Sequence, residues 1–405
     1  MELKVDKDLN FTCPKGCNSL PKNIFKSKKI KFRKLPGIWR YYDWLPVEKT
    51  TTYDGESVTY KSEHFGKELG LKNLYVTFTG YWPEINAYVK TCTFKELDAA
   101  VVIQNAKENG VSRLIVASAG STANAFAHLS SLEKFNVILV VPIEVADTLA
   151  SPFVDENHVK TIAVKGDYCD AISFAQKLHQ STHITYDGGG KNPARRDGLG
   201  TVMLEAVEKM KVLPNHYFQA VSSGAGAIAV FDEIDRLLGD GRFGKPHFKL
   251  HISQNAPFIP IVKAWNDKRR TIEKSDEEPE NALSVIYAKV LSNRQPLYGI
   301  NGGLFDALQA TSGETYSITN RQAEDAAKSF EYSEGIDIHP AAAVATASLI
   351  DAVQKGKIRS DENVMLNITG GGLKRAKKEF GMHKIPLTAK VEKDTPPQEL
   401  RDIIL

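Results

Sequence analysis

The stretch "RLIVASAGSTANAFAHLSSLEKFNVILVVP" (113–142) decides the fold class of this chain. It contains two apolar runs, 113–118 and 136–142, on either side of a segment with helical period. Strands that are apolar at nearly every position are typical of parallel sheets, because helices cover both faces of such sheets. The stretch therefore predicts a strand, a crossover helix and a second, parallel strand.

The same alternation extends along most of the 405 residues. Further strands are predicted at 73–78, 158–164, 216–222, 247–253 and 363–368. Helices are predicted at 94–109, 122–134, 168–180, 200–211, 226–238, 318–330 and 340–355. Because the chain is about two to three times as long as a typical domain, we predict an α/β protein of two doubly wound parallel-sheet lobes.

The bulk composition narrows the classes of function. The chain is 42% hydrophobic and 25% charged, and its net charge of +3 gives no reason to expect nucleic-acid or membrane binding. No stretch approaches the roughly 18 consecutive apolar residues of a membrane span, and "MELKVDKDLN" (1–10) lacks the apolar core of a signal peptide. Four cysteines do not make a disulfide framework, so we expect a soluble protein of the reducing cytoplasm.

Three turns rich in glycine and hydroxyl residues each follow a predicted strand. They are "SAGSTANA" (118–125), "SSGAGA" (222–227) and "NITGGG" (367–372). In a parallel sheet, ligands bind beyond the carboxyl ends of the strands, where such turns gather. The first turn suits a small carboxylate and the second a phosphate, because both begin helices. The second matches neither the P-loop spacing nor a full dinucleotide fingerprint, and any one turn alone is more typical of a tight βα connection.

A lysine with unusual neighbours occurs in "TCTFKELDAA" (91–100). Lys95 opens a predicted helix between Phe94 and an apolar face, where an amine has a lowered pKa and can act as a nucleophile. A cofactor with an aldehyde, a phosphate and a pyridine nitrogen needs a lysine, an anion cradle and a group facing the nitrogen. Lys95, the 222–227 turn and Thr369 would supply these contacts. The pattern alone leaves such a cofactor and ordinary tight turns both open.

Longer motifs in the same order carry a resemblance to a known family. The order of "TFKE", "SAGST", "NPARRDGLGT", "SSGAGA" and "TGGG" resembles the fold-type-II pyridoxal-phosphate enzymes, whose fold is like that of the tryptophan synthase β subunit. Within their threonine synthase branch, the chain is similar over nearly its whole length to the archaeal cysteate synthase family. The most specific matches are "RYYDWLPVE" (40–48), "GYWPEINAY" (80–88), "NPARRDGLGTVML" (192–204), "YGINGGLFDAL" (298–308) and "EGIDIHPAAAVA" (334–345).

The resemblance implies residues that hold the cofactor, pyridoxal 5'-phosphate. Lys95 would form a Schiff base with its aldehyde and shuttle the substrate α-proton, and Thr369 would hydrogen-bond the pyridine nitrogen. Main-chain N–H groups of one loop would bind the cofactor phosphate. That loop consists of Ser222, Ser223, Gly224, Ala225, Gly226 and Ala227.

The resemblance also implies residues that hold the substrate. The substrate carboxylate would be bound by Ser118, Gly120, Ser121 and Thr122. A phosphate leaving group would be clamped by Asn192, Arg195 and Arg196, because guanidinium groups match phosphate oxygens well.

The implied reaction is the replacement of the phosphate of O-phosphoserine by sulfite, which gives L-cysteate. Two alternatives stay open. One is a threonine synthase or related lyase acting on O-phosphohomoserine, since one methylene changes specificity by only about 1–3 kcal/mol. The other is a non-catalytic paralogue that binds an amino acid and regulates a partner.

The chain departs from the family at two places. Ser121 stands where an asparagine normally contacts the cofactor, and Asn124 is the candidate to compensate. Only one cysteine pair, Cys13 and Cys17, remains of two in the family, and His64 is isolated, so we expect free thiols and no bound metal.

The resemblance gives a domain plan and a place in metabolism. A large cofactor-binding domain is expected at 18–97 plus 207–385 and a small substrate domain at 98–206, with the cofactor in the cleft between them. Residues 1–17 form an N-terminal segment, and 386–405 form a loosely attached C-terminal extension. Family habit implies a homo-oligomer that serves the biosynthesis of a sulfonate such as coenzyme M. His339 is expected to cap the helix that starts near Pro340.

Overall fold

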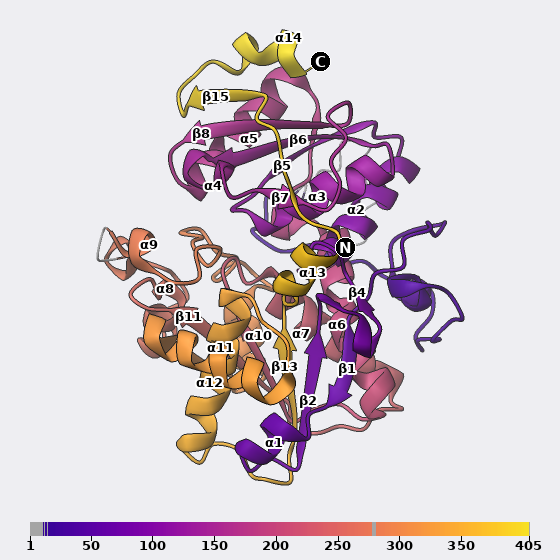
Figure 1. Ribbon diagram of the computed structural model, residues 1–405, viewed down its shortest axis with the longest axis vertical. Helices are drawn as coiled ribbons and strands as arrows, with labels where there is room; N and C mark the ends of the chain where they lie inside the picture. The colour runs from indigo at the N-terminus through magenta and orange to yellow at the C-terminus, as the bar shows by residue number, and fades with distance from the viewer. Residues whose placement is uncertain (1–10, 12, 14, 278–280, 405) are drawn as a thin grey trace.

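The computed structural model describes residues 11, 13, 15–277 and 281–404, and two sheets dominate it, one above the other in Figure 1. The lower sheet has six strands in the order β1-β2-β13-β10-β11-β12. Every neighbouring pair in it is parallel except β1 and β2. Its strands are β1 (Val58–Lys61), β2 (Asn73–Phe78), β10 (His216–Ala220), β11 (Lys249–Asn255), β12 (Glu314–Ile318) and β13 (Asn363–Ile368).

The upper sheet has five strands in the order β15-β8-β6-β5-β9, and all its neighbouring pairs are parallel. Its strands are β5 (Arg113–Ala117), β6 (Asn136–Pro142), β8 (Val159–Lys165), β9 (Thr185–Tyr186) and β15 (Ala389–Glu392). Two short antiparallel pairs join β3 (Tyr81–Trp82) to β4 (Ala87–Tyr88) and β7 (Ala150–Ser151) to β14 (His383–Lys384). The predicted α/β class with parallel sheets is confirmed.

Helices connect the strands and cover both faces of each sheet. The longer ones are α2 (Lys95–Glu108), α3 (Ser121–Leu132), α5 (Tyr168–Thr182), α6 (Pro193–Met210), α7 (Ala225–Asp240), α11 (Asn320–Glu334) and α12 (Pro340–Gln354). The short ones are α1 (His64–Glu68), α4 (Ile143–Ala146), α8 (Pro260–Asn266), α9 (Ala282–Val285), α10 (Leu304–Ala310), α13 (Leu373–Glu379) and α14 (Arg401–Ile404). Turns of 3₁₀-helix are η1 (Gly37–Trp44), η2 (Pro83–Ile85), η3 (Gly189–Lys191), η4 (Lys274–Glu277) and η5 (Pro397–Leu400). Within the described ranges, no helix combines the length and the apolar character that crossing a membrane requires.

The apolar runs of the strands divide their side chains between two cores. Leu114 and Val116 of β5 join the large central core, whereas Ile115 between them joins a second core under α5. Because successive side chains of a strand point to opposite faces, a strand covered on both sides is apolar at most positions on either face. The central core also includes Tyr217 and Ile252 of the lower sheet, so one apolar cluster lies between the two sheets.

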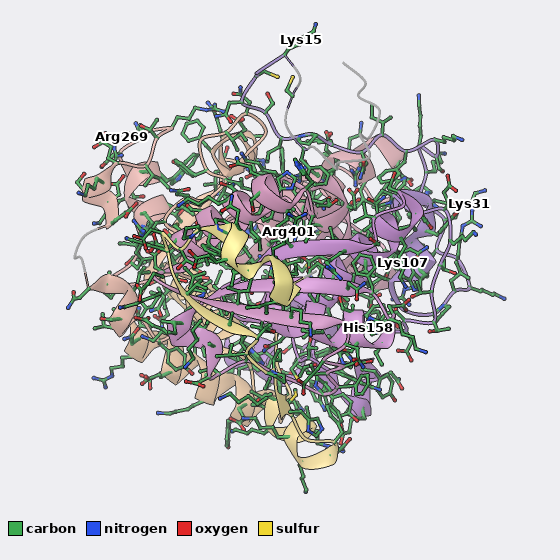
Figure 2. All side chains as sticks on the ribbon, turned by 90° about the horizontal axis from the view of Figure 1, so that it is seen from above. Lys15, Lys31, Lys107, His158, Arg269 and Arg401 are labelled. Carbon is green, nitrogen blue, oxygen red and sulfur yellow. The ribbon has the colours of Figure 1, made fainter. Side chains whose placement is uncertain are left out.

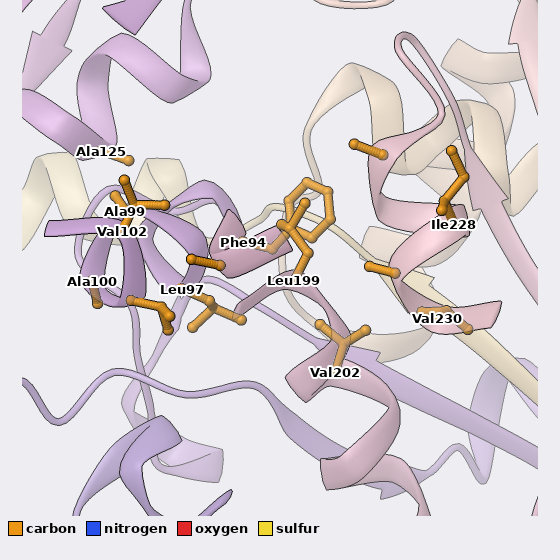
Figure 3. Close-up of a cluster of buried hydrophobic side chains, with 14 of the residues drawn as sticks. Phe94, Leu97, Ala99, Ala100, Val102, Ala125, Leu199, Val202, Ile228 and Val230 are labelled. Atoms are coloured by element: carbon orange, nitrogen blue, oxygen red, sulfur yellow. The ribbon is translucent and has the colours of Figure 1, made fainter. Parts of the chain in front are cut away.

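Three helices meet in that central core. Figure 3 shows Leu97 of α2 close to Leu199 of α6, with Ile228 of α7 on the far side. Helices α2 and α6 approach closely at a glycine: a Cβ atom at Gly198 would lie 2.8 Å from the Cα atom of Asp98. The domain boundaries expected near residues 97 and 206 fall inside α2 and α6, and the division into domains stays a prediction.

The C-terminal segment corrects one expectation. It is not a loosely attached extension, because β15 pairs in parallel with β8 and forms an edge of the upper sheet. Leu400 and Ile404 after it pack into the core that α5 covers. Figure 2, seen from above, shows this segment with Arg401 lying over the top of the sheet. The strand was not predicted from the sequence, because "AKVE" is short and its apolar residues alternate with charged ones, as is common in edge strands.

Removing residues 386–405 should therefore destabilise the protein. The deletion would expose the edge of β8 and the apolar surface under Leu400, both of which favour aggregation. We expect a melting temperature lower by several degrees in scanning fluorimetry, with aggregates on gel filtration. A Lys390→Gln variant, changed only at an exposed position of β15, is the control and should melt like the unaltered chain. Equal melting of the deletion would contradict the pairing.

A group of partly buried charges fastens η1 to the segment before β1 and to α6. The guanidinium of Arg40 lies 3.1 Å from a carboxylate oxygen of Glu56 and 3.3 Å from one of Glu208, and it also pairs with Glu205. The Tyr41 hydroxyl donates to Glu205 at 2.9 Å. Burial raises the pKa of Glu56 to about 7, and the other two carboxylates add to the rise against the opposing effect of Arg40.

This raised pKa should make stability depend on pH. The fold favours the protonated form of Glu56, so its contribution is fully present below about pH 4.3 and is lost as pH rises through about 7. Glu56→Gln, which has no charge to bury, should gain free energy of unfolding relative to the unaltered chain as pH rises, by up to about 3 kcal/mol. Urea unfolding at pH 5 and pH 8 would measure the difference, with exposed Glu63→Gln as the control. The same difference at both values of pH would contradict the assignment.

Candidate active site

A cavity of about 1360 Å³ collects the turns that follow the strands of both sheets. Its wall includes residues 117–122 after β5, residues 220–226 after β10, and Thr369 directly after β13. Lys95, at the start of α2, lies in the same wall. The carboxyl ends of strands from two separate sheets therefore face one shared space, as ligand sites in parallel sheets do.

Main-chain hydrogen bonds hold the segment before Lys95 against the turn after β13. The N–H of Phe94 donates to the carbonyl oxygen of Thr369 at 3.0 Å, and the N–H of Gly371 donates to that of Cys92 at 3.1 Å. A Cβ atom at Gly370 would lie 2.7 Å from the Cys92 oxygen, so only glycine permits this approach. Lys95 and Thr369 are thereby fixed in one wall although they are far apart in sequence.

The Lys95 amine has an environment that disfavours its charge. The face of the Phe94 ring, whose centroid lies 4.6 Å from the Nζ atom, attracts the ammonium, but burial acts against it. Burial lowers the pKa of Lys95, the carboxylate of Asp98 partly opposes that change, and the guanidinium of Arg195 adds to it. A lysine whose neutral form is favoured can act as a nucleophile and as a base. The amine is therefore a group with a lowered pKa in the wall of a cavity, and its reactivity stays a prediction.

The 222–227 turn opens α7, whose N-cap residue is a glycine without a capping side chain, and the Ser223 hydroxyl oxygen accepts the N–H of Ala225 at 3.3 Å. Gly224 takes φ +84° at the N-cap, and the residues from Ser222 to Gly226 line the cavity. A Cβ atom at Gly226 would lie 2.5 Å from Nε2 of Gln219, so a side chain there would crowd the floor of the turn. The first N–H groups of a helix are available to an anion where nothing caps them. Ala227 follows inside α7 and does not line the cavity.

The 118–122 turn opens α3 at another part of the wall. The Ser118 hydroxyl oxygen accepts the N–H groups of Gly120 at 3.0 Å and Ala123 at 2.8 Å, so it fixes the turn rather than facing the cavity alone. Ser121 and Thr122 line the cavity at the first residues of the helix. Asn124 does not join them, because its Oδ1 atom accepts the N–H of Ala150 at 3.1 Å and its side chain is outside the wall.

The three residues expected to clamp a phosphate do not all lie in the cavity wall. Arg195 lines the cavity, whereas Asn192 and Arg196 do not. The Asn192 side chain caps α6, and the Arg196 guanidinium donates to main-chain oxygens, including that of Gly190 at 2.8 Å. Arg196 is 2% exposed, so its charge is directed into the protein.

The structure adds residues that sequence reasoning missed. Asp98 and Asp187 are buried and pair with Arg195, and Gln219 lies under the 222–227 turn. The spacing of Asp98, three residues after Lys95 on one helix, was a signal for the first of them. His339 is the N-cap residue of α12 as expected, but its side chain makes no capping bond, and its ring lines the cavity.

Comparisons with known proteins give the family. Residues 59–370 match the family model described as pyridoxal-phosphate dependent enzyme. The chain is 44% identical over 400 residues to the cysteate synthase of Methanosarcina barkeri, covering 98% of this chain and 96% of that protein. The match to the cysteate synthase of Methanocella arvoryzae is also 44%, over 401 residues, with the same coverage.

The chain belongs to the cysteate synthase family. The resemblance drawn from its motifs is confirmed, and it is an enzyme that depends on pyridoxal 5'-phosphate. Solved structures agree in fold. Maize serine racemase has a TM-score of 0.58 at 12% identity, over 78% of this chain and 88% of that one. A pyridoxal 5'-phosphate-dependent aspartate racemase has a TM-score of 0.58 at 15% identity, over 78% and 90%.

The cavity fits the cofactor of this family. Pyridoxal phosphate needs an amine for its aldehyde, and the pKa of Lys95 is lowered by burial in the wall. It needs a place for its phosphate, and α7 starts in the same wall with no side-chain cap. The Thr369 side chain offers a hydroxyl beside them.

Cysteine thiolates are common metal ligands in proteins. Cys13, Cys17, Cys92 and Cys169 are free. Within the part of the chain that the structure describes, no cluster of three or more histidine, cysteine or acidic residues is arranged to hold a metal ion.

A methyl group at position 370 should disturb the site. Gly370→Ala would force the turn after β13 away from Cys92 and so move Thr369 relative to Lys95, at a cost of about 1–3 kcal/mol. We expect a lower melting temperature and less pyridoxal phosphate retained per chain, measured by absorbance after gel filtration. Gly239→Ala is the matched control, because a Cβ atom there meets nothing within 4 Å. Full cofactor retention in Gly370→Ala would contradict this account of the wall.

Proposed function

We propose that this protein catalyses the replacement of the phosphate of O-phosphoserine by sulfite, giving L-cysteate and phosphate. The observation that carries the proposal is the 44% identity to cysteate synthases over 98% of the chain. In the reaction, the bond from the β-carbon to the phosphate oxygen breaks and a bond from the β-carbon to sulfur forms. The α-proton leaves and returns, so the overall exchange needs no oxidant or reductant.

The residues of the cavity wall would hold the cofactor at three points. Lys95 would bind it covalently, residues 222–226 would bind its phosphate through main-chain N–H groups, and the Thr369 hydroxyl would face its ring nitrogen. Ala227 would support the start of α7 from inside the helix. Bound pyridoxal phosphate supplies an electron sink that makes the substrate α-proton labile.

Lys95 would also move the substrate proton. An amine serves as a base only when it is neutral, and the burial that lowers the pKa of Lys95 favours this state. The hydrogen bonds between the Phe94 segment and Thr369 hold the lysine at a fixed place in the wall. A fixed base close to the reacting carbon contributes to the rate through orientation as well as through proton transfer.

The start of α3 would orient the substrate. Main-chain N–H groups of Ser121 and Thr122 lie at a helix start whose N-cap residue is a glycine, which suits a carboxylate. Ser118 would act indirectly, because its hydroxyl fixes the turn through Gly120 and Ala123. The Asn124 side chain would take no part in holding the substrate, because its Oδ1 atom accepts the N–H of Ala150.

The charge of the cavity suits two oxyanions, the leaving phosphate and the incoming sulfite. Basic side chains in its wall outnumber the acidic ones, which are Glu273 and Glu277. The basic ones are Lys95, Lys191, Arg195, Arg270, Lys274, Lys289 and Arg294. Arg195, Arg270 and Arg294 are each paired with carboxylates, so the attraction for small anions would come mainly from the lysines. Asn192 and Arg196 would shape the turn around Lys191 rather than touch the phosphate.

The alternatives have less support. The reported relatives give no support to a threonine synthase acting on O-phosphohomoserine or to a non-catalytic regulatory paralogue.

We propose that the protein works in the cytoplasm as a homo-oligomer, in the biosynthesis of a sulfonate such as coenzyme M. Light scattering of the purified chain would test the assembly, and a monomeric mass would overturn that part.

The reaction can be tested with a panel of substrates. Purified protein loaded with pyridoxal phosphate should release phosphate from O-phosphoserine in the presence of sulfite, and mass spectrometry should find cysteate. O-phosphohomoserine is the competing substrate, and sulfide and water are the competing nucleophiles. Faster phosphate release from O-phosphohomoserine, with threonine as product, would overturn the proposal.

Lys95→Ala should abolish this chemistry. Loss of the base and of the covalent link should lower phosphate release by at least about 10²–10⁴-fold, and the yellow colour of the bound cofactor should be lost. Lys107→Ala, on the same helix but paired with Glu133, is the matched control. An active, yellow Lys95→Ala protein would mean that another residue carries the reaction.

A further inference from the structure

A carboxylate without exposure to solvent lies one helical turn after Lys95. Asp98 is 0% exposed, and its Oδ2 atom accepts the Nη1–H of Arg195 at 2.7 Å. Its other oxygen, Oδ1, is buried without a hydrogen-bond partner. Residues three apart on a helix share a face, so Asp98 and Lys95 lie on the same side of α2.

Arg195 lies between two such carboxylates. Its second terminal nitrogen pairs with Asp187, which is also 0% exposed, and its guanidinium lies 5.1 Å from the centroid of the Phe126 ring. Arg195 itself is 5% exposed, and its Nε atom and Oδ1 of Asp187 have no hydrogen-bond partner. Two buried carboxylates thus share one guanidinium that reaches the cavity wall.

When both carboxylates are ionised, the charges of this group balance only with a further cation or a proton. Two carboxylates and one guanidinium leave one negative charge in the interior, which is costly unless another cation or a proton offsets it. The charge of protonated Lys95 lowers the pKa of Asp98, and the charge of ionised Asp98 raises the pKa of Lys95. Burial raises the pKa of Asp98 and lowers that of Lys95, so each group favours its neutral form.

The other groups around the cluster do not supply the missing charge. Tyr168 of α5 faces Arg195, and burial raises its pKa to about 12, so its hydroxyl stays neutral. Tyr53 faces Asp98 from the segment before β1 and is buried and neutral for the same reason, since its pKa is well above its usual range. Lys95 is therefore the titratable group whose protonation state depends on the charge of Asp98.

We propose that Asp98 is a positioning residue for Lys95: held by Arg195, its buried carboxylate sets the charge that the lysine amine meets, and so how readily the amine releases and takes up a proton. The proposal rests on the proposed role of Lys95 as the base of the reaction. It goes beyond that role because Asp98 does not line the cavity and touches neither substrate nor cofactor.

A purely structural role is the competing explanation. Asp98 lies where α2 meets α6 at Gly198, and it could serve only to anchor Arg195. Asp187 separates the two explanations. It anchors the same arginine through the same kind of ion pair, but it is not among the charges that act on Lys95.

The experiment measures the titration of Lys95 in the full-length protein freed of cofactor. Reductive ¹³C-methylation followed by NMR gives the titration midpoint of each lysine, and Lys95→Arg assigns the signal. Asp98→Asn should lower the Lys95 midpoint by about 0.5–1 pH unit, because a charge that stabilised the ammonium is lost. Asp187→Asn, the matched control, should give a clearly smaller shift.

The loaded enzyme gives a second readout. The pH at which the absorbance of bound pyridoxal phosphate changes should move in Asp98→Asn, and the acid limb of the kcat profile should move with it. Equal shifts in Asp98→Asn and Asp187→Asn, or none in either, would overturn the proposal. Asp98→Ser, smaller and also uncharged, is the second variant; if neither Asp98 variant folds while Asp187→Asn does, the residue is structural and the proposal fails.

The design separates this proposal from the proposed function. The NMR titration needs no substrate, so it can succeed even if O-phosphoserine and sulfite do not react. Conversely, turnover of O-phosphoserine with an unmoved Lys95 midpoint would leave the function standing and remove Asp98 from it.

Discussion

The structure depends on one close approach of main chain. The segment that carries Lys95 lies against the turn after β13, joined by hydrogen bonds from Phe94 to Thr369 and from Gly371 to Cys92. It is possible because position 370 has no side chain to strike the Cys92 carbonyl. The contact fixes a lysine from one end of the sequence beside a hydroxyl from the other. The remaining walls of the cavity are arranged around that pair.

The large core between the sheets holds those walls at fixed positions. Helices α2, α6 and α7 pack side by side in it, as Figure 3 shows, and α2 and α7 both begin at the cavity. The start of α2 brings the lysine, and the start of α7 brings main-chain N–H groups that its N-cap glycine does not cap. Such close packing also fixes the positions of the buried charges, because side chains such as Asp98 and Arg195 cannot rotate out to contact water.

Most of the architecture could be predicted from the pattern of the sequence. The strands at 73–78, 136–142 and 363–368 begin and end where the predicted runs do, because burial on both faces makes most of their residues apolar, with Thr77 and Asn367 as buried polar exceptions. The edge strands β1, β12 and β15 were missed, since a strand with one neighbour carries a mixed pattern that a loop can also carry. In the site, the turns that begin α3 and α7 could be predicted because glycine and hydroxyl residues between a strand and a helix indicate an anion-binding turn.

The sequence by itself determined the fold class and the family and predicted the role of Lys95, because these depend on patterns and motifs that are contiguous along the chain. Only the tertiary structure decided what the arginines do. Arg195 and Arg196 are neighbours in the sequence, yet one reaches the cavity between two aspartates and the other is directed to main-chain oxygens. The partners of a buried charge come from distant segments, such as Asp98 on α2 and Asp187 after β9, and no local pattern records which of them will meet it.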